Sequence, residues 1–505
     1  MGAMAAAGLA GCSSQSAPPE SAGDAAVEQT AIEKTLDCDV CVVGAGVSGL
    51  AACVQAAQNG ASVIVVEAAG SAGGNGAGVE GSFAHGSPLQ KEQGIEFDFS
   101  KLIASEMSAT QYRVDARLWR DLYDKSGDNI AWLLENGVEF SGEINDYGTG
   151  GGIVSMHWYK DGKAGVGYVP PMTSKAEQLG VQFLYSTEAK RPVMEGGAVV
   201  GILAVDGDGK GVQVNAKSVI LATGGFGADA GMVAERIGYD PETLWYYGVP
   251  TNNGGGWRIA MEAGGKDFSY NAADNAHAYI RAMSHEGPTD MPNCGLSMCG
   301  YVVWVNQDGE RFVREDCAAT NFCQQNPPRW NQSEWYFVFD SSIYEAACAM
   351  YGVDAETGSK KLQDAVDGNE GDCFYTADTI EGLAKPFGLD AAALAAEIET
   401  YNGYCAAGRD EDWCKDAQWM MPVSQPPYYI AKPETLFLMT IGGIATDRNG
   451  QVVKADMTPV EGLYAVGVDG CMLYRNVYTI DAPGSCSGNG INMGRTAANA
   501  ACENL

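Results

Sequence analysis

The residues best suited to chemistry are three glycines and one acid near the start of the chain. Gly44, Gly46 and Gly49 have the GxGxxG spacing, and Glu67 lies 18 residues after the last of them. Glycines at this spacing allow a tight turn and let a backbone N–H approach a pyrophosphate. A carboxylate at this distance can accept hydrogen bonds from the two hydroxyls of an adenosine ribose. Together, the four residues predict a dinucleotide site.

A strand, a helix and a second strand must hold these four residues in place. An apolar strand is expected over 39–43, an Ala-rich helix over 50–58 and a second apolar strand over 62–66, which ends at Glu67. The N-terminus of the helix would offer free N–H groups and a partial positive charge to a phosphate. Because all the parts occur in the order that the motif requires, we interpret them as one βαβ unit.

The composition is that of a large globular protein without a nucleic-acid partner. A chain of 505 residues is long enough for two domains and a large core. Its net charge of −33 leaves no basic surface that could neutralise the phosphates of a nucleic acid. A strongly acidic surface is compatible with a protein that works outside the cytoplasm.

The N-terminal segment predicts export and a lipid anchor. Residues 9–12 read LAGC, which resembles a bacterial lipobox with Cys12 as the attachment site, and a low-complexity tether follows. We therefore expect residues 1–35 to be a lipoprotein signal and tether, and the protein to be extracytoplasmic and anchored to the cell membrane. No positive charge precedes Cys12, which favours a start further upstream and a twin-Arg signal. The alternative is a disordered Ala/Gly-rich leader.

The cysteines raise the question of a metal site. Cys294, Cys299, Cys317 and Cys323 fall within 30 residues and could hold an iron–sulfur cluster or zinc. Their spacing matches no standard ferredoxin pattern, so we favour buried thiols or disulfides and predict no metal site.

The order of the other segments predicts one domain interrupted by another. A buried strand at 219–223 would return the chain to the nucleotide-binding sheet. The stretch 271–423 is rich in aromatic residues and cysteines, and strands and glycine turns resume after it. We predict an α/β fold: a Rossmann-like domain with a parallel sheet, made of residues 36–270 and 424–505, and an inserted α+β capping domain. The chain would end in a helix over 491–499.

Smaller elements complete this outline. The leucine spacing over 100–140 is helical. The stretches 181–185 and 198–205 alternate like strands of a small sheet, and Gly196-Gly197 fits a hairpin turn.

Several sequence blocks resemble the FAD-dependent fumarate reductase/succinate dehydrogenase flavoprotein family, which includes urocanate reductases and 3-ketosteroid Δ1-dehydrogenases. The resemblance covers roughly 37–270 and 424–505, and with the lipobox it is most similar to exported flavin reductases of gut actinobacteria. The middle segment matches only through VNQDGERFVRED. The other blocks are VVGAGVSGLAA, AGGNGAG, VILATGGFG, TIGGIATD and EGLYAVG.

This resemblance implies FAD as the cofactor and assigns its contacts to matching positions. The expected contacts are Gly44, Gly46, Ser48 and Gly49 for the pyrophosphate, Glu67 for the ribose, Gly74, Asn75, Gly76 and Gly81 for the isoalloxazine, Ala189 for the adenine, Asn253 where the family usually has Asp, and Asp469, Ser485 and Cys486 over the flavin and ribityl chain.

The catalytic positions of the family do not carry over. Fumarate reductases have an Arg that acts as the proton donor eight residues after the Arg of the RFxxE block. This chain has Ala319 at that position. The Arg that binds a substrate carboxylate corresponds to Asp481. A dicarboxylate clamp is therefore not expected, nor is fumarate as the substrate. Tyr478 stands where the dehydrogenases carry a tyrosine before a Pro-Gly turn.

Four residues remain as candidates for catalysis. Tyr478 could act as an acid or as a hydrogen-bond donor to an enolate, and Asp481 could orient it or bind a polar substrate. Arg475 and Arg314 are candidate charge partners. The alternatives are a packed tyrosine, a turn aspartate and structural ion pairs.

We thus expect an exported FAD-dependent oxidoreductase acting on CH–CH groups. It would reduce a C=C bond conjugated to a carbonyl, in an enone, enoate or steroid-like molecule, by hydride transfer from flavin N5. Electrons would come from a membrane-side quinol dehydrogenase or cytochrome. The alternatives are 3-ketosteroid Δ1-dehydrogenase-type oxidation and a non-catalytic FAD electron shuttle.

Overall fold

The computed structural model describes residues 31–281, 291–293, 295–321, 323, 327–369, 372–503 and 505. The predicted lipid anchor Cys12, nearly all of the predicted tether, and Cys294 lie outside the described residues. Across the described ranges, no helix is both long enough and apolar enough to span a bilayer.

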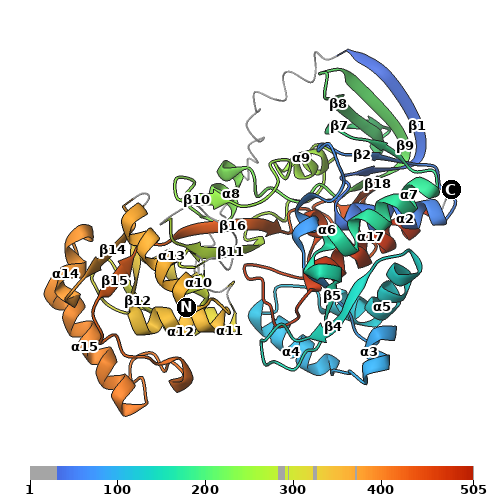
Figure 1. The fold of residues 1–505 in the computed structure, drawn as a ribbon. Coiled ribbons are helices and arrows are strands. Elements are labelled where there is room, and N and C mark those ends of the chain that lie inside the picture. Colours follow the sequence, from blue (N-terminus) through green and yellow to red (C-terminus); the bar gives the residue numbers. More distant parts are fainter. Residues whose placement is uncertain are drawn as a thin grey trace, which may run out of the picture.

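An eight-stranded sheet carries the nucleotide-binding half of the molecule (Figure 1). Its central strands are parallel, so their carboxyl ends meet at one edge, which is where open α/β sheets bind ligands. β17 (Gln451–Val453) pairs antiparallel at one end, and the hairpin β7 (Thr187–Glu195) and β8 (Ala198–Asp206) joins through β9. The parallel strands are, in order, β18 (Pro459–Ala465), β9 (Gly211–Leu221), β1 (Ile32–Val43), β2 (Val63–Val66) and β6 (Gln182–Leu184).

The predicted small sheet over 181–185 and 198–205 is wrong. β6 pairs with β2 at the edge of the main sheet, and β8 pairs with β9. Alternation reports that one face of a strand is buried but not which strand lies beside it, so sequence alone could not choose the partner. The hairpin at Gly196-Gly197 is confirmed, with φ of 59° and 88° at these two residues.

Two helices pack on this sheet and on each other, α2 (Val47–Gln58) and α17 (Ser485–Cys502). They can approach closely because Gly494 has no side chain: a Cβ there would lie only 2.5 Å from the Ser48 carbonyl oxygen. α17 begins well before the predicted residue 491. The segment 483–490, which the sequence predicts to be a glycine turn, is helical from Ser485. Its glycines serve close packing: a Cβ on Gly488 would lie 2.8 Å from the Phe83 oxygen.

A second layer of elements lies beside the main sheet. A small antiparallel sheet runs in the order β3 (Gly81–Phe83), β5 (Met156–Tyr159) and β4 (Phe140–Asn145). The helical pattern predicted over 100–140 is resolved into two helices, with Gln111 and Tyr112 at positive φ between them. The helices of this layer are α3 (Pro88–Gln93), α4 (Phe99–Ala109), α5 (Ala116–Glu135), α6 (Ala164–Gly167) and α7 (Val169–Gln178).

The remaining part of the chain forms a lobe joined through a three-stranded sheet (Figure 1). β16 (Glu434–Ile441) lies between β10 (Leu244–Tyr246) and β11 (Ala273–Tyr279) in this joining sheet. The lobe has its own antiparallel sheet. Together with the parallel strands of the main sheet, it confirms the predicted α/β fold, whereas the domain boundaries 271 and 423 stay a prediction. The lobe's elements are β12 (Val303–Asn306), β13 (Trp335–Asp340), β15 (Tyr428–Ala431), β14 (Phe374–Ala377), α12 (Ser341–Met350), α13 (Ala355–Gly368), α14 (Ile380–Ala384) and α15 (Ala391–Ala407).

Candidate active site

Two of the three glycines in the turn after β1, Gly44 and Gly49, have no room for a side chain. Gly44 has φ +104°, and a Cβ there would lie 2.3 Å from the Ala222 oxygen. A Cβ on Gly49 would lie 2.0 Å from the Gly44 oxygen. Gly46 is the N-cap of α2 and supplies no side-chain cap, so the first N–H groups of the helix stay open to a ligand. This cradle fits a pyrophosphate.

Glu67 stands at the end of β2, next to the glycine turn. Its two carboxylate oxygens accept hydrogen bonds from the N–H groups of Ala45 (2.6 Å) and Ala69 (2.7 Å). Burial raises the pKa of Glu67, while these backbone donors favour the charged form. The carboxylate is therefore fixed beside the turn, where the ribose of a dinucleotide is expected.

The predicted flavin loop is the 3-10 helix η1 (Gly74–Gly78). A Cβ on Gly76 would lie 2.7 Å from a methyl of Val47, so this loop packs on the start of α2. Asn75 ties the loop to two other segments, accepting from Val249 N (2.7 Å) and donating to Leu438 O (2.9 Å). Gly81 follows in β3.

The other predicted contacts lie around the same edge of the sheet. Ala189 is in β7, and Asn253 precedes α9 (Gly255–Glu262), where it accepts from Gly255 N (3.0 Å). Asp469, in α16 (Gly467–Gly470), is buried and accepts from Thr223 Oγ1 (2.9 Å) and Gly225 N (2.8 Å). It thereby joins the turn after β9 to α16.

The N-terminus of α17 is a second site for negative charge. Its N-cap is Gly484, with φ +76° and no side-chain cap, and Ser485 and Cys486 form its first turn. The Ser485 hydroxyl hydrogen-bonds the Tyr474 hydroxyl, and burial raises the pKa of the Cys486 thiol. Both α2 and α17 thus present glycine N-termini without side-chain caps, which favour negative charge such as that of phosphate groups.

Tyr478 lies in an apolar cluster close to these turns. Its ring meets that of Tyr474 edge-on, with centroids 5.0 Å apart, and the cluster includes Phe83 and Cys323. Burial raises its pKa well above the usual value. Within the described part of the chain, its hydroxyl makes no hydrogen bond.

The other three predicted catalytic residues are engaged elsewhere. Asp481 accepts a hydrogen bond from the Ser105 hydroxyl on α4. Arg475 lies over the Phe268 ring (4.0 Å to the centroid) and donates to the Phe268 oxygen (2.9 Å). Arg314 pairs with Asp316 next to the short helix α11 (Cys317–Thr320) and is half exposed. The catalytic roles of Asp481, Arg475 and Arg314 remain predictions.

Sequence reasoning missed two carboxyl groups near this site. Glu80 follows the flavin loop and accepts from the Tyr147 hydroxyl (2.8 Å). Glu106 is fully buried on α4 and accepts from the Thr479 hydroxyl (2.6 Å). Glu80 could have been noticed as the acid in a glycine-rich run. Tyr147 and Glu106 carry no motif, and only the fold brings them here.

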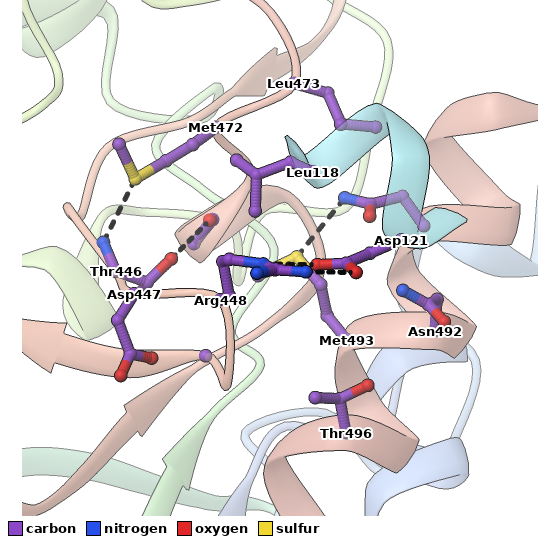
Figure 2. Close-up of a pocket in the computed structure, with 13 residues that line it drawn as sticks. Leu118, Asp121, Thr446, Asp447, Arg448, Met472, Leu473, Asn492, Met493 and Thr496 are labelled. Carbon is purple, nitrogen blue, oxygen red and sulfur yellow. Dashed lines mark hydrogen bonds and ion pairs between the residues drawn. The ribbon is translucent and has the colours of Figure 1, made fainter. Parts of the chain in front are cut away.

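A hollow away from these residues carries no assignable chemistry (Figure 2). Its walls include Leu118, Met493 and Thr496, and none of the predicted catalytic residues lines it. Two of the charges in it form an ion pair, with Arg448 Nη2 2.6 Å from Asp121 Oδ1.

The cysteines do not form a metal centre in the described ranges. Cys299 and Cys323 carry free thiols there. No three His, Cys, Asp or Glu side chains of the described residues are placed to share a metal ion.

Comparison with known proteins identifies relatives along most of the chain. A family model described as "FAD binding domain" matches residues 39–482. A vinyl phenol reductase of Lactiplantibacillus plantarum is 32% identical, over 91% of this chain and 96% of the relative. A urocanate reductase of Eggerthella lenta is 28% identical, over 88% of this chain and 71% of the relative. The open conformation of a flavocytochrome c3 fumarate reductase has a TM-score of 0.69 at 26% identity, over 94% of this chain and 79% of that chain.

Proposed function

We propose a substrate class for this chain from the premise that it belongs to the FAD binding domain family. As a member of this family, it is an FAD-dependent oxidoreductase that acts on CH–CH groups and reduces C=C bonds. When bound and reduced, FAD supplies a hydride. Our proposal is that the acceptor is a flat, uncharged molecule whose C=C bond is conjugated to a carbonyl or to a phenol ring.

This proposal is carried by two arginines of the described part of the chain, Arg475 and Arg314, both of which are engaged with other protein groups. Arg475 is held against Phe268, and Arg314 is paired with Asp316. Glu80, which follows the flavin loop, accepts a hydrogen bond from the Tyr147 hydroxyl and offers no positive charge to a carboxylate. A fumarate-like dianion would therefore have neither of these two arginines as a partner, whereas an uncharged ring would pack on the aromatic cluster around Tyr478.

The relatives support the phenol version of this acceptor. A vinyl phenol reductase is similar over nearly its whole length, and the C=C bond named there is conjugated to a hydroxylated ring. We therefore place 4-vinylphenol first among the acceptors to test, followed by steroid and dietary enones.

Flavin reoxidation tests this function directly. The FAD-loaded protein is reduced with dithionite without oxygen, and the return of the band near about 450 nm is followed after each acceptor is added. We expect 4-vinylphenol or an enone to reoxidise the flavin much faster than fumarate or urocanate. The proposal is refuted if fumarate is the faster acceptor. Bleaching of the oxidised enzyme by a saturated ketone would indicate the dehydrogenase direction, and inertness in both directions an electron shuttle.

We also propose that the protein is lipid-anchored outside the cytoplasm and receives electrons from a membrane-side quinol dehydrogenase or cytochrome. The LAGC sequence ending at Cys12 supports this proposal. Cell fractionation tests it: wild-type protein should sediment with membranes, whereas C12A should be released. Equal distribution of the two proteins would contradict the anchor.

A further inference from the structure

Glu80 stands between the two segments predicted to line the flavin ring. The helix η1 ends just before it, and Gly81 begins β3 just after it. Its backbone oxygen accepts from Tyr159 N (2.9 Å), which fixes the main chain here. The side chain reaches solvent, yet burial raises its pKa. The carboxylate is thus open to water, which can reprotonate it.

Tyr147 is held against this carboxylate. Its hydroxyl donates to Glu80 Oε2 (2.8 Å), and its ring stacks on Trp158 with centroids 5.6 Å apart and planes 10° apart. Its backbone has φ +60°, which residues with side chains rarely adopt, and its N–H donates to Asn145 Oδ1 (3.0 Å). The ring also packs on the cluster that contains Tyr478. The phenol is thus fixed between an acid and the candidate substrate site.

Saturating a C=C bond requires a proton as well as a hydride. Tyr478 is poorly equipped to supply protons repeatedly, because its hydroxyl makes no hydrogen bond to any described residue through which a proton could return. Arg314 is paired with Asp316. Tyr147, by contrast, is hydrogen-bonded to a carboxyl group.

We propose that Tyr147 donates the proton that completes reduction of the C=C bond and that Glu80 restores it. This inference rests on the proposed function. The hydride forms a C–H bond at one alkene carbon. The Tyr147 O–H bond breaks as its proton forms a C–H bond at the other carbon. Glu80, in its acid form, returns a proton to the phenolate oxygen and is reprotonated by water. The substrate gains two electrons, which the reduced cofactor loses.

The electrostatics of the pair support this assignment. Burial raises the pKa of Glu80 by more than the hydrogen bond from Tyr147 lowers it, which favours the acid form that the relay needs. Burial also raises the pKa of Tyr147, which keeps the phenol protonated. The other titratable groups near the pair are Cys323, Tyr478 and Cys486, and burial raises the pKa of each. All three therefore stay neutral around pH 7.

Reoxidation of the reduced holoenzyme by its best acceptor tests the proton donor. We expect Y147F to slow this step by roughly 100-fold or more, the usual contribution of a general acid. E80Q should slow reoxidation less than Y147F does, and it should remove the decrease of the reoxidation rate at alkaline pH. The matched control is Y112F, because Tyr112 is 75% exposed and should leave the rate unchanged.

A second readout does not depend on turnover. The absorption of the oxidised flavin should shift with pH as Glu80, which follows the flavin loop, ionises. E80Q should abolish this transition, whereas Y112F should keep it. The proposal is overturned if Y147F retains half of the wild-type rate with a normal flavin spectrum, or if E80Q titrates like the wild type. A wild-type protein that no acceptor reoxidises would instead refute the proposed function.

Discussion

At the residue scale, the lobe contains a group of charged side chains with no exposure to solvent. Arg311 Nε lies 2.8 Å from Glu315, Arg311 Nη2 lies 2.9 Å from Asp410, and Lys415 Nζ lies 3.3 Å from Glu315. Burial alone would raise the pKa of Glu315, but Lys415 and Arg311 outweigh this effect and lower it. The RFxxE block of the sequence is thus a structural ion network here.

Glu315→Gln should therefore destabilise the lobe strongly. The substitution leaves two buried cations short of a partner, which costs about 3–5 kcal/mol in comparable sites. The control is Asp364→Asn, which breaks the exposed Lys360–Asp364 pair and should cost no more than about 0.5 kcal/mol. Urea unfolding of the FAD-loaded proteins measures both changes. Equal losses in the two variants would contradict a special role for the buried network.

Glu106 should make stability depend on pH. Burial raises its pKa from 4.5 to about 8, so the folded protein binds a proton that the unfolded chain releases. Its contribution to stability is complete below pH 4.5 and is lost progressively as pH rises to about 8. We expect the Tm of Glu106→Gln to fall less than that of the wild type over this range. Differential scanning calorimetry at several pH values tests this, and parallel curves would refute it.

At the element scale, the contact between α2 and α17 sets the geometry of the cofactor site. Gly494→Ala would place a Cβ 2.5 Å from the Ser48 oxygen and push the helices apart. We expect loss of FAD and a lower Tm, measured by flavin absorption and thermal unfolding. The matched control is Gly403→Ala in α15, where a Cβ meets nothing within 4 Å. It should raise stability by about 0.5–1 kcal/mol. Retention of FAD by G494A would contradict this account.

The βαβ unit was predictable because every part of it is local. Strand, glycine turn, helix and acid lie within one short stretch, and each has a type of residue that only this geometry requires. The sequence predicts the start of the last helix at 491, after its true start at Ser485, because the prediction again uses only local residues. A Gly–Ser run is typical of a turn, and only the approach of Phe83 from elsewhere in the chain explains glycine in a helix there. The Glu80–Tyr147 pair was out of reach, because its members are 67 residues apart.

At the scale of the whole molecule, the cap lobe has a core of its own. One buried cluster contains only residues between Ala278 and Ala431, whereas the clusters around the main sheet draw on both ends of the chain. The two parts are joined through the sheet of β10, β16 and β11. This is the arrangement expected if the lobe folds as an inserted unit.

The two cores should therefore respond differently to the cofactor. A ligand that binds only the folded state stabilises the unit that holds it, by RT ln(1 + [L]/Kd), or about 2.7 kcal/mol at 100 times Kd. We expect two calorimetric transitions, of which excess FAD raises only the one that belongs to the nucleotide-binding part. E315Q should lower the other one, which identifies the lobe. A single transition that moves as a whole with FAD would show that the joining sheet couples the two cores, and would refute independent unfolding of the lobe.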